Sequence, residues 1–145
     1  MKKYTAIDLF AGCGGLSLGL ENAGFESVYV NELNNDALES YLINREKKNP
    51  YLRERFNSND VKTMISDKKY LKNLVKDFKS TYNLDVNSGD LTLLAGGPPC
   101  QGYSGIGHRR TYSVDKEQIP SNFLYQDMAC LLYTSPSPRD GLLSR

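Results

Sequence analysis

The apolar positions of the chain fall into short strand-like runs separated by segments of helical periodicity. The first run, 4–10 (YTAIDLF), is rich in β-forming residues and stops at the glycine cluster 12–15, which predicts a strand followed by a tight turn. Between 16 and 23 apolar residues recur at the spacing of one helix face, and Gly24 follows. Glycine readily adopts the left-handed conformation that ends helices. The chain is therefore predicted to begin with a strand, a glycine turn and a helix.

The same alternation continues toward the middle of the chain. Residues 27–30 (SVYV) read as a second strand, and Asn34 is placed to cap a helix whose apolar face lies within 37–42. The polar stretch 51–67 gives no clear periodicity, although 57–61 has the composition of a short strand end.

A third helix and a further strand are the clearest patterns in the second half. Apolar residues within 70–78 follow the 3.6-residue helical period, and the turn-forming segment 87–89 bounds them. Residues 91–95 (LTLLA) are nearly all apolar, as in parallel strands that are covered on both faces. Strands that alternate with helices form right-handed βαβ units. The predicted fold is thus α/β, with an open, mostly parallel, doubly wound sheet.

Composition and charge narrow the classes of protein further. The chain has 145 residues, of which 39% are hydrophobic and 24% charged, as expected for one globular domain and not for a disordered or fibrous chain. Its formal charge of +1, from 18 Lys and Arg against 17 Asp and Glu, leaves no general electrostatic attraction for nucleic acid. No apolar run is long enough to span a bilayer. We expect a cytoplasmic protein without a membrane partner.

The glycine turn and the acid after the second strand form the first candidate site. Glycines at a strand-to-helix turn let backbone N–H groups approach a ligand, and Glu32 is placed to accept hydrogen bonds from ribose hydroxyls. These features outline an adenosine-cofactor pocket. A tight turn that binds nothing is the alternative, because Ser17 stands where the dinucleotide fingerprint has its third glycine. Asp60 follows the third strand and is either a partner for an adenine amino group or a solvated turn residue.

The second candidate site is the loop 96–104 (GGPPCQGYS), which follows the last predicted strand. Ligands of open α/β sheets bind at this carboxyl edge. Prolines fix the approach to Cys100, which is interpreted as a nucleophilic thiolate. A papain-like protease is disfavoured because His108, the only histidine, has no evident pairing with it. Cys13 and Cys130 receive no role, and the three cysteines lack the spacing of a metal site, so no metal is expected.

Taken together, these motifs resemble the first motifs of the DNA cytosine-5 methyltransferases, in order and in spacing. The segment PPCQGYS is highly specific, whereas the glycine loop is shared more widely. An NAD-dependent enzyme that uses a glycine loop and a thiol has little support once the PPCQGYS segment is considered. The resemblance covers about residues 4 to 130, through DLFAGCGGLSLGLENAGF (8–25), NELNNDALESY (31–41), ND (59–60), GGPPCQGYSGIGHRR (96–110) and NFLY (122–125).

This resemblance implies an S-adenosylmethionine-dependent methyltransferase fold and a role for each matching residue. Glu32 is expected to hold the ribose and Asp60 to meet the adenine, while Cys100 is the nucleophile. Phe10, Gly12, Gly14 and Leu124 border the cofactor. The loop around and after the nucleophile would face the substrate through Pro99, Gln101, Ser104, Arg109 and Arg110, the two arginines as phosphate contacts or as an ordinary solvated basic turn.

The implied chemistry explains the residue types. A thiolate that adds to the 6-carbon of cytosine turns the ring into an enamine, which can attack an electrophilic methyl group through its 5-carbon. Because these atoms are inaccessible in a stacked duplex, the base must be flipped out. The implied partners are double-stranded DNA and, in a restriction-modification system, a cognate restriction endonuclease.

The resemblance ends before the family's later motifs. No Glu follows Glu117, so the acid that would protonate the cytosine ring has no candidate after the nucleophile. The family's target-recognition region is also missing. A helix beginning near Asn122 is expected to lose its period after Leu131. We expect residues 1–130 to be the N-terminal part of a truncated catalytic domain. Residues 131–145 then form a tail foreign to the family, either adapter read-through or a natural truncation.

Two functions of different class follow from this expectation. The first is a fragment of a DNA cytosine-5 methyltransferase, which by itself should be inactive. The second is a remnant that binds S-adenosylmethionine or a regulatory partner without transferring a methyl group.

Overall fold

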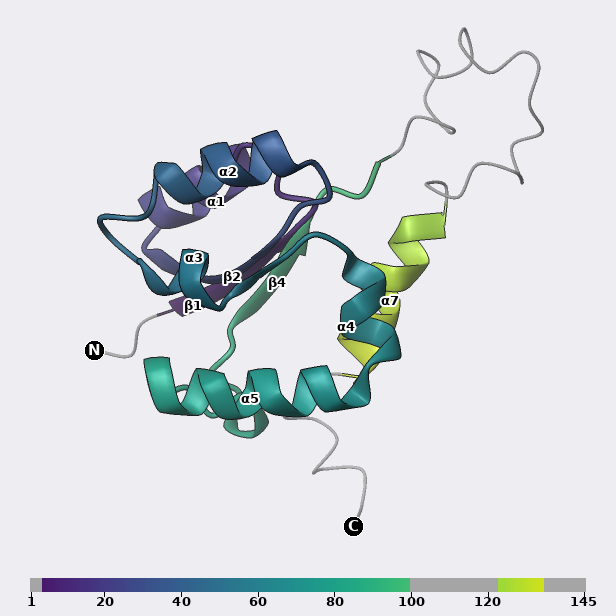
Figure 1. Ribbon diagram of the computed structural model, residues 1–145. Helices are drawn as coiled ribbons and strands as arrows, with labels where there is room; N and C mark the ends of the chain where they lie inside the picture. The colour runs from purple at the N-terminus through teal and green to yellow at the C-terminus, as the bar shows by residue number, and fades with distance from the viewer. Residues whose placement is uncertain (1–3, 100–122, 135–145) are drawn as a thin grey trace, which may run out of the picture.

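The computed structural model describes residues 4–99 and 123–134, which form an α/β unit around a four-stranded parallel sheet (Figure 1). The strand order is β3-β2-β1-β4, so the chain first adds strands on one side of β1 and then crosses to the other side. This reversal makes the sheet doubly wound and confirms the fold predicted from the sequence. The strands are β1 (Tyr4–Leu9), β2 (Phe25–Asn31), β3 (Asn57–Ser58) and β4 (Leu93–Gly96).

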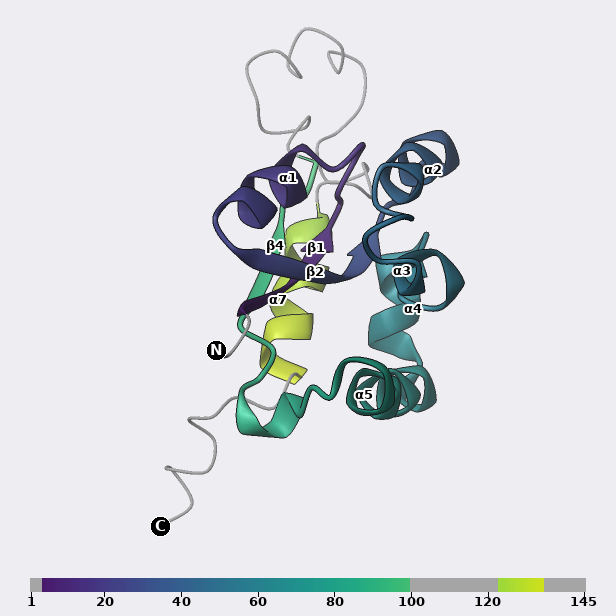
Figure 2. The ribbon, with the colours of Figure 1, turned by 90° about the vertical axis from the view of Figure 1, so that its left-hand side faces the viewer.

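The helices lie on both faces of this sheet. In Figures 1 and 2 the strands run between α1 and α5, and α7 packs against α4. Within the described residues no helix combines the length and the apolar character needed to cross a membrane. The helices are α1 (Gly15–Asn22), α2 (Asn35–Ile43), α3 (Tyr51–Glu54), α4 (Val61–Ser66), α5 (Lys68–Tyr82) and α7 (Leu124–Thr134), with a 3₁₀ turn at Val86–Ser88.

Two different kinds of packing hold the faces of the sheet. On the α5 face, aromatic rings form the core: the Phe56 and Phe78 rings are stacked with centroids 5.2 Å apart, and Tyr29 meets Phe78 edge-on at 6.4 Å. On the α1 and α2 face, the fully buried Asp8, Ser17 and Tyr41 join strand and helices by hydrogen bonds. Rings bury large apolar areas and stabilise the first face.

The predicted helix boundaries are confirmed where local chemistry sets them. The Asn34 side chain accepts a hydrogen bond from the Ala37 amide at 3.0 Å and so caps α2. Gly24, which follows the C-cap residue Ala23 of α1, has a positive φ of 93°. The short strand predicted at 57–61 is present as β3, while the ambiguous stretch around it forms the helices α3 and α4.

Two expectations about the later elements were wrong. The strand predicted at 91–95 begins at Leu93, and its residues are half-buried. The Thr5 and Thr92 hydroxyls replace ladder hydrogen bonds there, each accepting from the other residue's amide at 3.2 Å. In the described part of the chain β4 is also an edge strand. The last helix continues to Thr134, past the expected break after Leu131, which is buried.

Candidate functional site

A cavity of about 480 Å³ opens at the carboxyl ends of the four strands. Every strand contributes the residues that directly follow it, and the first residue of α7 closes one side. Parallel sheets gather their functional residues at this edge because all strands end there in the same direction. The lining residues are Phe10, Asn31, Glu32, Leu33, Asn34, Asn59, Asp60, Val61, Gly97, Pro99 and Leu124.

Glu32 connects the glycine turn to the start of α2. One carboxylate oxygen, Oε2, accepts from the Gly12 amide at 2.7 Å, and the other, Oε1, accepts from the Asn34 amide at 2.8 Å. Each carboxylate oxygen has two lone pairs, so this lining residue keeps further acceptor capacity. The arrangement suits a group that accepts hydrogen bonds from ligand hydroxyls.

Phe10 stands at the junction of β1 and the glycine turn in an unusual backbone conformation. Its φ is 57°, a left-handed value that is uncommon outside glycine. The following residue, Ala11, donates from its amide to the Asn31 carbonyl at 3.0 Å, which holds the turn against the end of β2. Such conformations persist where the surroundings enforce them, often at ligand sites.

Asp60 and Asn59 form the wall of the cavity after β3. Asp60 caps α4, with Oδ1 accepting from the Lys62 amide at 2.9 Å. The Asn59 side chain donates to the Glu32 carbonyl at 3.2 Å and to the Asn35 side-chain oxygen at 2.7 Å. Asn59 therefore links the loop after β3, which carries Asp60, to the loop after β2, which carries Glu32.

The two glycines predicted to border the cofactor lie differently. Gly12 is not among the lining residues, and its contribution is the amide that donates to Glu32. Gly14 lies behind the turn with φ 92°, where an added Cβ would be 2.6 Å from Arg45 Nη1 and 2.7 Å from the Tyr41 ring. Only glycine fits there, because both the backbone conformation and the space exclude a side chain.

Several lining residues were missed by the sequence reasoning. Leu33, with 72% of its surface exposed, and Val61 bring apolar surface to the cavity, and Asn31 is buried beneath it. Leu33 and Val61 each follow a predicted acid, and Asn31 is the last residue of β2. Their positions at strand ends could therefore have indicated that they line the site. The predicted Cys100, Gln101, Ser104, Arg109 and Arg110 lie outside the described residues, whereas Pro99 lines the cavity.

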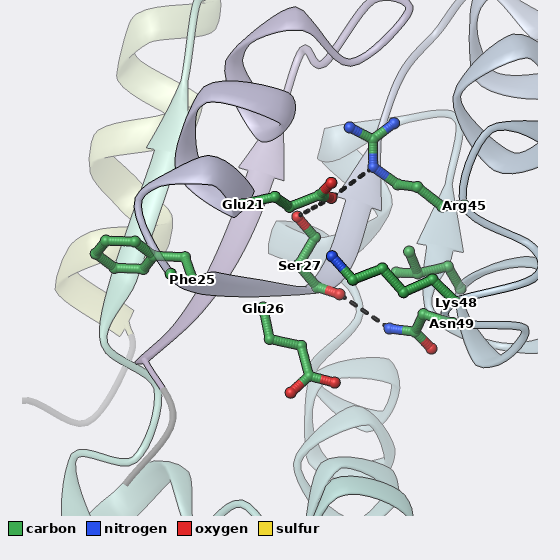
Figure 3. A pocket seen from close by; sticks show the side chains of 9 residues that line it. Glu21, Phe25, Glu26, Ser27, Arg45, Lys48 and Asn49 are labelled. Carbon is green, nitrogen blue, oxygen red and sulfur yellow. Dashed lines mark hydrogen bonds and ion pairs between the residues drawn. The ribbon is translucent and has the colours of Figure 1, made fainter. Parts of the chain in front are cut away.

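A second cavity, of about 340 Å³, opens at the opposite edge of the sheet, where β2 begins (Figure 3). Two of its charged side chains are paired with each other: Arg45 Nε donates to Glu21 Oε1 at 2.7 Å. The Ser27 hydroxyl donates to the same carboxylate oxygen at 3.2 Å. The cavity at the carboxyl edge is the candidate ligand site, because four residues that the motifs assign to a cofactor line it.

This fold and this edge cavity define the class: a doubly wound α/β protein with a ligand site at the carboxyl ends of its strands. A family model described as C-5 cytosine-specific DNA methylase matches residues 4–125. The chain belongs to that family, as its motifs predicted.

Related proteins from distant organisms match the chain over most of its length. It is 33% identical over 130 residues to the chicken (Gallus gallus) DNA (cytosine-5)-methyltransferase 1, covering 86% of this chain and 8% of that protein. It is 35% identical over 140 residues to the type II methyltransferase M.AgeI of Thalassovita gelatinovora, covering 89% and 29%. The chain thus spans less than a third of either relative.

A solved methyltransferase structure has a fold similar to that of this chain. The crystal structure of a prophage-encoded DNA modification methyltransferase (E. coli) aligns with a TM-score of 0.52 and 25% sequence identity. The alignment covers 91% of this chain and 29% of that one.

Proposed function

We propose that the chain carries the cofactor site and the nucleophile of a DNA cytosine-5 methyltransferase. One observation carries the proposal: Phe10, Glu32, Asp60, Pro99 and Leu124, far apart in the sequence, line one cavity at the carboxyl edge of the sheet. The family motifs assigned four of these residues to the cofactor and the fifth to the loop of the nucleophile.

The residues of the cavity fit S-adenosylmethionine. The Glu32 carboxylate, oriented by two backbone amides, would accept from the ribose hydroxyls. Asp60 would accept from the adenine amino group through Oδ2, because Oδ1 caps α4. Phe10 and Leu124 supply apolar surface, and a volume of about 480 Å³ lies in the usual range of small-molecule sites. S-adenosylmethionine, when bound, supplies an electrophilic methyl group.

Cys100 would perform the covalent step. It directly follows Pro99, a lining residue of the cavity, so the thiol would enter the reaction beside the cofactor. Its thiolate would add to the 6-carbon of a flipped-out cytosine, and the 5-carbon of the resulting enamine would form the new carbon–methyl bond. The methyl–sulfur bond of the sulfonium would break in the same step, and its electron pair would stay on sulfur as a neutral thioether. Loss of the 5-proton to water would then restore the double bond and release the thiolate.

The same loop would hold the DNA. Arg109 and Arg110 are proposed to contact phosphate, and Gln101 and Ser104 to face the base or its backbone. The type II names of several relatives support a role in a restriction-modification system, with a cognate restriction endonuclease as the functional partner.

Calorimetric titration of the 145-residue chain with S-adenosylmethionine tests the cofactor assignment. We expect saturable binding at one site, and no heat of binding with NAD, which shares the adenosine but represents a different enzyme class. Absence of S-adenosylmethionine binding, or equal binding of NAD, would contradict the proposal. Covalent trapping by Cys100 separates a methyltransferase from a protein that only binds the cofactor.

A further inference from the structure

A buried arginine supports the glycine turn from the side opposite the cavity. Arg45 is 6% exposed, and its guanidinium makes a different contact on each edge. Nε donates to Glu21 Oε1 at 2.7 Å, and Nη2 donates to the Gly14 carbonyl at 3.1 Å (Figure 3 shows the pair with Glu21). Its plane lies over the Tyr41 ring, 4.0 Å from the centroid. The arginine therefore joins α1, α2 and the turn.

The Tyr41 hydroxyl extends this support to the end of β1. It lies 2.7 Å from Ser17 Oγ, which in turn donates to Asp8 Oδ2 at 2.6 Å. Asp8, Ser17 and Tyr41 are all fully buried. The hydrogen bond between Asp8 and Ser17 bridges the two ends of the loop that contains the turn, and Tyr41 fixes this bridge to α2.

The turn is consequently held at two points by one stretch of chain. The Gly12 amide binds Glu32 just before α2, and the Gly14 carbonyl binds Arg45 just after it. Arg45 and Tyr41 do not line the cavity at the carboxyl edge. Their effect on a ligand there must pass through the turn.

We infer that Arg45 and Tyr41 are positioning residues that set the affinity of the edge cavity for its cofactor by fixing the glycine turn from behind. The inference rests on the proposed function. The guanidinium suits the task because its rigid fork reaches two acceptors at once while its face stacks on a ring, and a lysine ammonium cannot do all three.

Two conservative variants test it, each with a matched control. Arg45→Lys keeps a cation near Glu21 but loses the fork, and Arg53→Lys makes the same change in an exposed pair with Glu39. Tyr41→Phe removes the hydroxyl but keeps the ring. Ser40→Ala removes an exposed hydroxyl, bonded to the Asp36 carbonyl, from the same helix.

Two measurements are made on the full 145-residue chain. Calorimetry gives the S-adenosylmethionine dissociation constant. Amide hydrogen exchange compares Gly12, which reports the turn, with Val30, whose amide donates to the Phe56 carbonyl within the sheet. General destabilisation would raise exchange at both amides together, whereas a released turn raises it at Gly12 alone.

For both test variants we expect binding weaker by about three- to tenfold, the range of one lost hydrogen bond, and a raised ratio of Gly12 to Val30 exchange. The controls should match the wild type in both readouts. An unchanged affinity, or an unchanged exchange ratio, in both test variants overturns the inference. If the wild-type chain binds no S-adenosylmethionine, the proposed function fails, and the exchange ratio alone then decides whether α2 fixes the turn.

Discussion

The carboxylate of Glu32 accepts a hydrogen bond from the Gly12 amide at 2.7 Å, across twenty positions of sequence. The bond ties the turn after β1 to the residue after β2, the two strand ends that form one side of the edge cavity. Because the second oxygen of Glu32 accepts from Asn34, the position of the acid is settled before any ligand arrives. Such preorganisation lowers the entropy that binding must overcome.

Replacement of Glu32 should therefore weaken cofactor binding specifically. In Glu32→Ala, ribose hydroxyls lose their acceptor and two backbone amides are left unpaired, so we expect a loss of about 1 to 3 kcal/mol in S-adenosylmethionine binding. Calorimetry on the 145-residue chain measures it. Glu46→Ala, which removes an exposed glutamate 3.7 Å from Arg53, is the control. An unchanged affinity in Glu32→Ala would remove Glu32 from the site.

Cys100 should be indispensable for covalent chemistry. In a hybrid enzyme where residues 4–125 of this chain replace the matching segment of M.AgeI, a duplex with 5-fluorocytosine should trap the protein, because fluorine cannot leave as the 5-proton does. Cys100→Ser should abolish trapping and methyl transfer, since a serine hydroxyl is barely ionised at neutral pH. Gel shift under denaturing conditions measures the adduct, and Cys13→Ser, which changes an exposed free cysteine of the same segment, is the control. Trapping retained by Cys100→Ser would contradict the assignment of the nucleophile.

Gly14 and Gly15 should respond oppositely to alanine. Gly14→Ala combines a left-handed φ with a Cβ 2.6 Å from Arg45 Nη1, and we expect a loss of about 2 to 4 kcal/mol of unfolding free energy. Around Gly15, the first residue of α1, a Cβ meets nothing within 4 Å. Gly15→Ala should leave stability unchanged or raise it by up to about 1 kcal/mol. Urea denaturation followed by circular dichroism measures both, and equal losses would show that the space behind Gly14 is not restricted.

The stability of the chain should carry a pH dependence from Asp8. Burial raises the pKa of Asp8 above its usual value of 3.8, although the hydrogen bond from Ser17 and the charge of Arg45 act in the opposite direction. In the described residues its Oδ1 atom is buried without a hydrogen-bond partner. The folded chain thus holds the proton more tightly than the unfolded chain. The contribution of Asp8 to stability is greatest below pH 3.8 and is lost as the pH rises through the folded pKa.

Asp8→Asn removes this titration. Its melting temperature, relative to the wild type, should therefore climb as the pH is raised from acid to neutral, because the wild type must bury a charge there and the variant does not. Thermal unfolding monitored at a series of pH values measures the difference. Asp36→Asn, at an exposed position in the first turn of α2, should show no such trend. A flat difference for Asp8→Asn would mean that the pKa of Asp8 is the same in the folded and the unfolded chain.

Although it left α3 and α4 unassigned, the sequence by itself determined the alternation of the main strands and helices, the parallel doubly wound sheet and the family. Local signals sufficed for these, because periodicity, the Asn34 cap and the glycine after α1 act over a few residues. It also pointed to Phe10, Glu32, Asp60, Pro99 and Leu124, through motifs at strand ends that a parallel sheet must bring to one edge.

Only the tertiary structure decided what each of these residues contacts. The left-handed backbone of Phe10 and the late start of β4 depend on partners far away in sequence, as do the placement of Gly14 behind the turn and the burial of Arg45. Arg45 has no apolar pattern that would mark it as buried. Its guanidinium is buried because Glu21, the Gly14 carbonyl and the Tyr41 ring surround it together, and that convergence exists only once the sheet and its helices have packed.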